Sequence, residues 1–191
     1  MIRRLFLLLL FTSSLFTTSI LAQNNTFADI SGTPQDFTVP NVAARMVEGL
    51  GFRYYWASKD LRSEDLAFDP VEEGRNMDQT IGHLLGLSEF LLSAVEKRTF
   101  MGIDYSKMTF DQKRELTLDK LEKARDILRN AKVEDFESFN ITFQDGNQLP
   151  FWNAINGPIA DAIYHTGQIV MMRRMSGNPI ASINVLAGVK N

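Results

Sequence analysis

The sequence has no cysteine and only two histidines among its 191 residues, and these shortages limit the chemistry available to it. Without a thiol the chain has no disulfide, no thiolate nucleophile and no sulfur ligand for zinc. Any metal site must therefore use histidine, aspartate and glutamate. The motifs of a P-loop, a dinucleotide-binding turn and a nucleophile elbow are also absent. Because His83 and His165 both fall in apolar helical patterns, a Ser-His-Asp triad has no support either.

Positive charge is also in short supply. The chain has 20 lysines and arginines against 23 aspartates and glutamates, which gives a net charge of −3, and the basic residues form no patch. A protein that binds nucleic acid normally concentrates positive charge to neutralise phosphates. We therefore expect no nucleic-acid partner.

The N-terminus has the pattern of a secretory signal peptide. A basic start containing Arg3 and Arg4 precedes an apolar run over residues 5–11, and small residues lead to a cleavage neighbourhood at residues 21–23. The apolar run is short for a membrane span. The pattern predicts a signal peptide over residues 1–22 and a periplasmic or extracellular mature protein of net charge −5. The alternative is an uncleaved N-terminal anchor.

The rest of the chain predicts an all-α protein, a four-helix bundle with a small β-hairpin between its third and fourth helices. Apolar residues recur at helical spacing in four segments, and Asp145-Gly146 is a hairpin turn signal. We expect a linker over residues 23–39, one bundle domain over 40–179 and a C-terminal tail over 180–191. The predicted helices span residues 41–59, 77–97, 109–131 and 157–175.

Capping residues support three of these helix starts. Asn76 with Gln79, and Thr109 with Gln112, have the spacing of capping boxes, in which two side chains satisfy backbone N–H groups reciprocally. Asn156 is the candidate cap of the fourth helix, and we expect the loop over residues 63–75 to be irregular.

Asp161 is the residue that most strongly indicates a site. It lies about one turn inside the predicted fourth helix, on an otherwise apolar cylinder, and His165 follows at i+4 on the same face. A third ligand, His83, would arrive from the second helix. A buried carboxylate needs a cation, so these residues predict a divalent metal site. The alternative is an ion pair of Asp161 with Arg53 or Arg125.

Three segments of the chain resemble the DinB-like, YfiT-like family of putative metal-dependent proteins. They are Leu50–Ala57, Thr80–Leu84 and Ile155–Gln168, and the resemblance extends over about residues 40–179. It implies a four-helix bundle with up-down-down-up helix directions, often dimeric, with a three-histidine zinc or nickel centre in a cleft. His83 and His165 match two of those histidines, and Asp161 stands at the third. A carboxylate there also suits a harder ion, such as iron or manganese.

Together these features predict an exported metal-dependent hydrolase of a small-molecule substrate. Two alternatives stay open: a non-catalytic metal- or ligand-binding bundle, possibly a homodimer, and a thiol-dependent transferase like some members of the family, which the signal peptide argues against. We expect Gln168 to orient a ligand or a water molecule, and the candidate rim residues are Tyr164, Asn156, Asn153 and Trp152.

Overall fold

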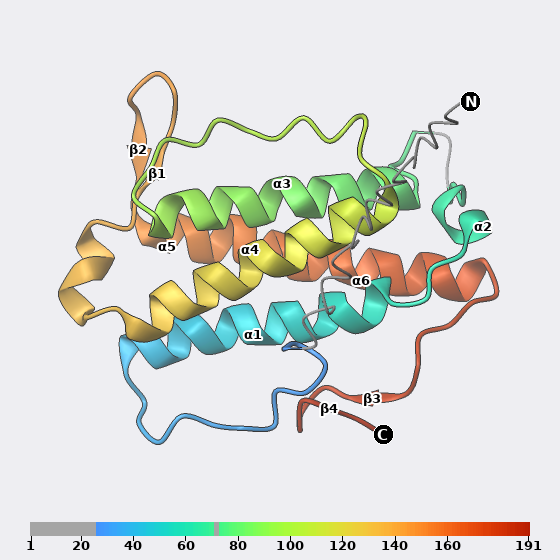
Figure 1. Cartoon of the computed structure of the whole chain (residues 1–191), viewed down its shortest axis with the longest axis horizontal. Helices are drawn as coiled ribbons and strands as arrows, with labels where there is room; N and C mark the ends of the chain where they lie inside the picture. Colours follow the sequence, from blue (N-terminus) through green and yellow to red (C-terminus); the bar gives the residue numbers. More distant parts are fainter. Residues whose placement is uncertain (1–25, 71–72) are drawn as a thin grey trace, which may run out of the picture.

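Four long helices form the framework of the protein. In this computed structural model, which describes residues 26–70 and 73–191, they are α1 (Val39–Ser58), α3 (Met77–Val95), α4 (Phe110–Asn130) and α6 (Ala160–Met175). They pack side by side along their lengths (Figure 1). The expectation of an all-α protein is confirmed. The predicted signal peptide, residues 1–22, lies outside the described residues.

The directions of the helices follow from their connections. α1 and α6 run one way, and α3 and α4 run the other (Figure 1). Because α3 and α4 are parallel, residues 96–109 must return along the length of α3 between them. Tyr105 of this return packs against α3 at Gly82, where an added Cβ would lie 2.4 Å from the Tyr105 ring. The connection is therefore held against the helix that carries His83.

Side-chain caps define the starts of three helices, and the sequence predicts two of them, Asn76 and Thr109. Thr38 accepts a hydrogen bond from the backbone N–H of Asn41 at the start of α1. The capping boxes at Asn76 and Thr109 are both present. A side-chain cap of this kind contributes about 1 kcal/mol to stability. α3 and α4 therefore begin at the expected residues.

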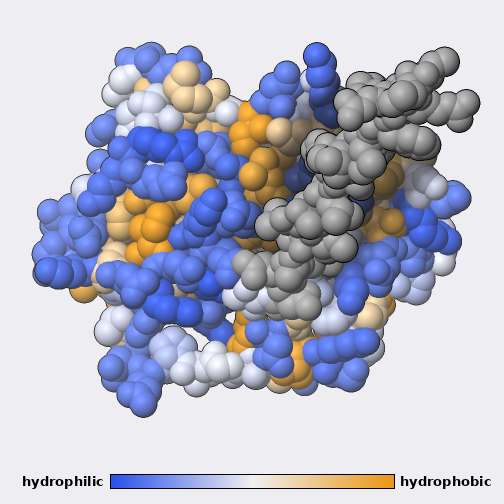
Figure 2. Space-filling model, viewed as in Figure 1, coloured by the Kyte–Doolittle hydropathy of each residue, from blue (hydrophilic) through white to orange (hydrophobic). Residues whose placement is uncertain are grey.

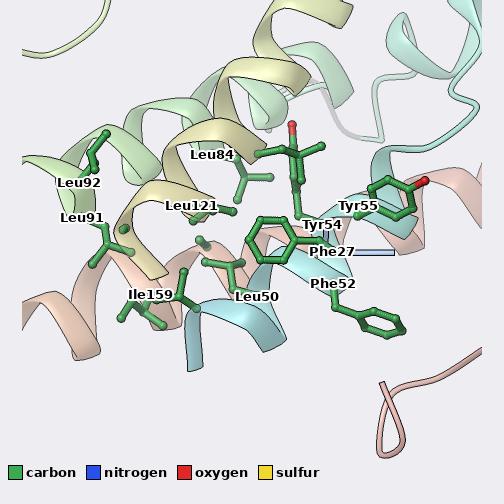
Figure 3. Packing of buried hydrophobic residues seen from close by; sticks show 14 of the residues in the cluster. Phe27, Leu50, Phe52, Tyr54, Tyr55, Leu84, Leu91, Leu92, Leu121 and Ile159 are labelled. Atoms are coloured by element: carbon green, nitrogen blue, oxygen red, sulfur yellow. The ribbon is translucent and has the colours of Figure 1, made fainter. Parts of the chain in front are cut away.

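The core lies between the four long helices, where α1 and α3 each pack against α4 and α6. Leu50, Leu84, Leu121 and Ile159 converge there from α1, α3, α4 and the segment before α6 (Figure 3). Outside this core, hydrophilic residues dominate the face that α4 covers (Figure 2). None of the helices in the described parts of the chain has both the length and the apolar character needed to cross a membrane.

Part of the segment expected to be a linker belongs to this core. Phe27 is 1% exposed, and its ring sits against Gly51 of α1 so closely that an added Cβ there would lie 2.5 Å away. Ile30 is also buried. The part of this segment around Phe27 and Ile30 thus packs on the core, because burying these two apolar side chains is favourable, whereas residues 31–39 stay largely exposed.

Smaller elements complete the fold around the long helices. The expected hairpin is present: β1 (Ile141–Thr142) pairs antiparallel with β2 (Gln148–Leu149), and Gly146 takes a φ of +84° in its turn. A second hairpin, which the sequence analysis did not predict, lies in the C-terminal tail: β3 (Ile183–Asn184) pairs with β4 (Val189–Lys190). The N–H of Ile30 donates to the carbonyl of Gly188 in this tail, at 2.8 Å. The loop over residues 63–75 contains the short helix α2 (Ser63–Leu66), and a 3₁₀ turn, η1 (Val133–Glu137), follows α4.

The fourth helix differs most from expectation. It begins at α5 (Phe151–Ala154), continues through a π-helical turn, η2 (Ile155–Ile159), and only then becomes α6. Asn156 is therefore inside the helix, and the prediction that it caps the N-terminus was wrong. Pro158 cannot donate a backbone hydrogen bond, and the wide π turn accommodates it without ending the helix.

Candidate metal centre

Three side chains of metal-ligand type meet between α3 and α6. Nε2 of His83 lies 3.3 Å from one carboxylate oxygen of Asp161, and Nε2 of His165 lies 3.4 Å from the other. The two imidazole rings meet edge to face, with centroids 4.5 Å apart. One donor atom from each residue falls within a 4.8 Å group. These three residues lie close enough together to hold a metal ion.

The helices explain this convergence. Asp161 and His165 lie one turn apart on α6, so their side chains project in the same direction. The π turn η2 ends two residues before Asp161. It adds a residue to the local turn, which changes the direction in which the later side chains project from the helix. π turns of this kind are frequent at functional sites. The sequence analysis missed this turn, and the signal available was Pro158 within an apolar helical run.

Asp161 is not the buried carboxylate that the sequence argument assumed. Its side chain is 42% exposed, whereas those of His83 and His165 are 27% and 8% exposed. Asp161 sits at the rim of the group, and His165 lies deeper in the protein. The site is therefore open to solvent on the carboxylate side.

The alternative of an Asp161–arginine ion pair was wrong. Arg53 donates to the backbone carbonyl of Gly49 at 2.8 Å, one turn earlier on its own helix. Arg125 pairs with its neighbours Glu122 and Asp126 on α4. Asp161 faces two imidazoles instead.

Gln168 fixes the chemical state of His165. Its side-chain oxygen lies 2.7 Å from Nδ1 of His165, so Nδ1 carries a proton and donates it to the amide. In the neutral imidazole this leaves a lone pair on Nε2, the nitrogen that faces Asp161. An outer partner that fixes the tautomer of a histidine in this way is typical of metal-binding histidines.

The surroundings of His83 keep it neutral. Its pKa is lowered from the usual value, chiefly because burial disfavours the charged ring and then because the cation of Arg75 lies nearby, and these effects outweigh the opposing carboxylate of Asp161. A neutral ring has a lone pair to offer a metal. Arg75, an exposed residue just before α3, is a member of this site's surroundings that the sequence analysis missed.

The distances and the donor types of the three residues are compatible with a bound ion. Charge-assisted N–H to carboxylate bonds are about 2.7–2.9 Å long, and the two contacts here are 3.3 and 3.4 Å. The two contacts run to different oxygens of Asp161, and one donor atom from each of the three residues lies within 4.8 Å of the others. Two imidazoles and one carboxylate are also a donor set that zinc and iron sites use. These residues fit a divalent ion.

The expected rim residues divide into two groups. Tyr164 stays close, with its ring 5.3 Å from that of His165, and its side chain is largely exposed. Trp152 lies nine residues before Asp161 and lines a different cavity, beside Phe136 and Val39. Asn153 and Asn156 lie on the same early part of the helix as Trp152, and Asn156 is exposed. Helical rise separates Trp152 from Asp161 by about 13 Å along the axis.

Comparison with known proteins adds no identification. No family model matches the chain, and no curated protein matches it. The site must therefore be interpreted from its own geometry.

Proposed function

We propose that this protein is an exported, DinB-like four-helix bundle that binds a divalent metal through His83, Asp161 and His165 and hydrolyses a small-molecule substrate. The observation that carries the proposal is the state of His165. Its Nδ1 lies 2.7 Å from the side-chain oxygen of Gln168, a contact that requires an Nδ1–H donor, and its Nε2 lies 3.4 Å from a carboxylate oxygen of Asp161. In the neutral ring that Nδ1–H leaves, Nε2 offers a lone pair, so Nε2 and the carboxylate are placed to share a cation.

The family part of the proposal rests on the sequence motifs and is supported by the helix directions. α1 and α6 run against α3 and α4, which is the up-down-down-up order expected from the resemblance. His83 and His165 occupy the positions of family histidines, and Asp161 takes the place of the third.

The exposure of the site favours catalysis over a structural role. Asp161 and His83 both retain solvent access, and a catalytic site must leave a position open for water or substrate, whereas a structural site is closed. The helices also pack through a large apolar core that does not involve the three ligands. A bound ion would therefore add little to the stability of the fold.

The chain's own residues have separable tasks in this proposal. A divalent ion held there would act as a Lewis acid toward a carbonyl or phosphoryl oxygen and would make a nearby water more acidic. His83 and His165 bind through neutral nitrogens, Gln168 holds the tautomer of His165, and the half-exposed Asp161 carboxylate balances positive charge. Tyr164 is exposed beside His165, with its ring 5.3 Å away, and is the candidate rim residue nearest the three ligands.

Metal content is the first test. The full chain, expressed with its N-terminus intact so that the host processes it, should contain about one ion per chain by elemental mass spectrometry. His83→Ala and Asp161→Ala should lose it, and Glu134→Ala, which removes an exposed carboxylate from η1, should keep it. An ion-free parent under every loading condition would refute the metal site.

Hydrolysis is tested next, on metal-loaded protein. A panel of esters, amides and phosphoesters should contain a substrate whose turnover disappears in Asp161→Ala and persists in Glu134→Ala. Full metal loading without turnover of any panel member would favour the non-catalytic metal-binding alternative. The absorption spectrum of the cobalt-substituted protein separates the two further, because added azide should change the spectrum only where a coordination position is open.

A further inference from the structure

Two adjoining cavities lie between α1, α6 and the C-terminal hairpin. Their volumes are about 660 Å³ and about 560 Å³, and small-molecule sites usually have about 300–1,000 Å³. The cavities share three lining residues, Arg53 of α1, Ile163 of α6 and Val185 of the turn between β3 and β4, so they form one elongated space. We call this space the Arg53 cleft. None of the three candidate metal ligands lines it.

The walls of the Arg53 cleft come partly from outside the four long helices. On α1 its lining residues include a stripe at helical spacing, Val42, Met46, Gly49 and Arg53. The residues before α1 and the tail with β3 and β4 run on the same side of this helix (Figure 1). The N–H of Ile30 joins them by donating to the carbonyl of Gly188 at 2.8 Å. The cleft is therefore a feature of these added segments as much as of the bundle.

The cavity at the α6 end is positively charged. Arg53 and Arg174 line it, and no aspartate or glutamate does. Arg53 donates to the carbonyl of Gly49 at 2.8 Å, and an added Cβ at Gly49 would lie 3.2 Å from its Nη1. Arg174 contacts the sulfur of Met171 at 4.0 Å, and neither arginine forms an ion pair within the described residues. Since a guanidinium carries five N–H donors, this pair is suited to bind an anionic group.

The other cavity is mainly apolar. Phe37 and Leu186 line it and are 99% and 95% exposed, and contiguous exposed apolar residues mark an interaction site. Its two charged side chains do not favour an anion at this end. Arg45 already pairs with Glu48 at 3.1 Å, and Asp36 is itself a carboxylate. The Arg53 cleft therefore has one cationic end and one apolar end.

The length of the Arg53 cleft indicates the kind of molecule that would fill it. Helical rise places Arg53 and Val42 about 16 Å apart along α1. One acyl chain spans half of the ~30 Å hydrocarbon core of a bilayer, or about 15 Å. A short anion would leave the apolar cavity unfilled, and a neutral hydrocarbon would leave the two arginines without a counter-charge. A long chain with one terminal carboxylate satisfies both ends.

We propose that the Arg53 cleft binds a long-chain fatty acid, with its carboxylate between Arg53 and Arg174 and its chain directed along α1 toward Val42. Arginine pairs with a carboxylate through two parallel hydrogen bonds, and burial of the chain against apolar side chains is favourable. The site is separate from His83, Asp161 and His165, so its tests do not depend on metal binding.

Isothermal titration calorimetry tests binding on the full chain, processed by its expression host and stripped of bound lipid. Laurate, kept below its micelle-forming concentration, should bind at one site with a low micromolar dissociation constant. Dodecanol has the same chain without the charge and should bind about tenfold more weakly. Acetate has the carboxylate without the chain and should bind at least ~100-fold more weakly.

Two kinds of variant test the two ends of the Arg53 cleft. Arg53→Gln and Arg174→Gln should each weaken laurate binding about tenfold and leave dodecanol binding unchanged, because only laurate has the charge that they recognise. Lys107→Gln, which removes an exposed cation that lines neither cavity, should change neither affinity.

At the other end, Val42→Glu places a charge against the chain and should weaken laurate and dodecanol binding alike, by ~100-fold. Met101→Glu, at an exposed position that lines neither cavity, should leave both unchanged. Circular dichroism checks that each variant folds.

Three outcomes would overturn the proposal. The first is a parent that does not bind laurate, and the second is a folded Arg53→Gln variant that binds laurate as tightly as the parent does. The third is an equal loss of laurate and dodecanol binding in Arg53→Gln, which would make Arg53 a structural residue. If a parent that does not bind laurate co-sediments with phosphatidylglycerol vesicles, this face contacts a membrane. If that parent instead self-associates and Val42→Glu prevents it, the occupant is a second copy of the chain.

Discussion

Asp65 and Asp161 are two carboxylates of this protein with opposite surroundings. Asp65 has no exposed side-chain surface and accepts hydrogen bonds from Arg62 at 2.7 Å, from Ser176 at 2.6 Å and from Asn178 at 2.6 Å. Asp161 is 42% exposed and faces two imidazole nitrogens at 3.3 and 3.4 Å. The charge of Asp65 is satisfied by an arginine and two further donors within the fold. Among the described residues, Asp161 contacts two histidines and no lysine or arginine.

This difference separates a structural carboxylate from a candidate metal ligand. Asp65 joins α2 to the end of α6, where Arg173 also donates to the carbonyls of Ala57 and Lys59 at the end of α1. Satisfying a buried charge so completely fixes the relative position of three helices. Asp161 contributes little to packing, and its geometry is explained by what it could bind.

The largest expected effect is the loss of metal affinity when Asp161 is changed. Asp161→Ala should weaken binding of zinc or iron by about 1,000-fold, equivalent to about 4 kcal/mol, because it removes a directly bonding and charge-balancing group. Without metal, its free energy of unfolding should change by less than about 1 kcal/mol, as expected at a half-exposed position. Competition with a chelating dye and urea denaturation measure the two quantities. Strong destabilisation of the metal-free protein would make Asp161 a structural residue like Asp65.

Asp65→Ala should show the converse behaviour. It leaves Arg62, Ser176 and Asn178 without their shared acceptor, and we expect a loss of about 3 kcal/mol in the free energy of unfolding. Metal content at temperatures where the variant is folded should equal that of the parent. Urea denaturation and elemental analysis on one preparation provide both measurements. A loss of stability below 1 kcal/mol would contradict the structural role.

Gln168→Ala should have an intermediate effect on the metal site. The variant keeps all three ligands but frees Nδ1 of His165, so its tautomer is no longer fixed. Changes of this kind cost about 10–100-fold in metal affinity. Gln168→Glu, which still accepts the Nδ1 proton, should retain near-parent affinity, and equal losses in both variants would rule out tautomer control.

The smallest expected effect is on the pH dependence of the free energy of unfolding, to which the Asp65 carboxylate contributes. Arg62 above all, with Ser176 and Asn178, holds the pKa of the Asp65 carboxyl well below its usual range. A carboxyl with a lowered folded-state pKa stabilises fully above its unfolded pKa of about 3.9, and that contribution is lost as pH falls through the folded pKa. The stability difference between the parent and Asp65→Asn should therefore be constant from about pH 6 to 8 and shrink progressively below about pH 4. If the stability difference between the parent and Asp65→Asn persists at low pH, the difference comes from packing and not from the charge of Asp65.

Much of the fold could be predicted because its signals are local. The caps at Asn76 and Thr109 lie next to the helices they begin, and the Asp145-Gly146 turn lies between the strands it joins. The start of the fourth helix could not be predicted in the same way. Pro158 normally indicates a helix boundary, and only packing of Phe151 and Ile159 into the core favours a helix that continues through it. The burial of Phe27 depends in the same way on a distant partner, Gly51.

The candidate site shows the same division. The i, i+4 spacing of Asp161 and His165 guarantees that they share a face wherever α6 lies, and the absence of cysteine restricts the ligands to histidine and carboxylate. The approach of His83, 78 residues before Asp161, the solvent exposure of the carboxylate and the cation of Arg75 depend on how α3 packs against α6. The sequence by itself therefore determined the helices, their caps and the ligand types, because hydrogen bonds and helical periodicity act over a few residues. Only the tertiary structure decided which side chains meet and which remain open to water, because those outcomes come from the packing of helices far apart in the chain.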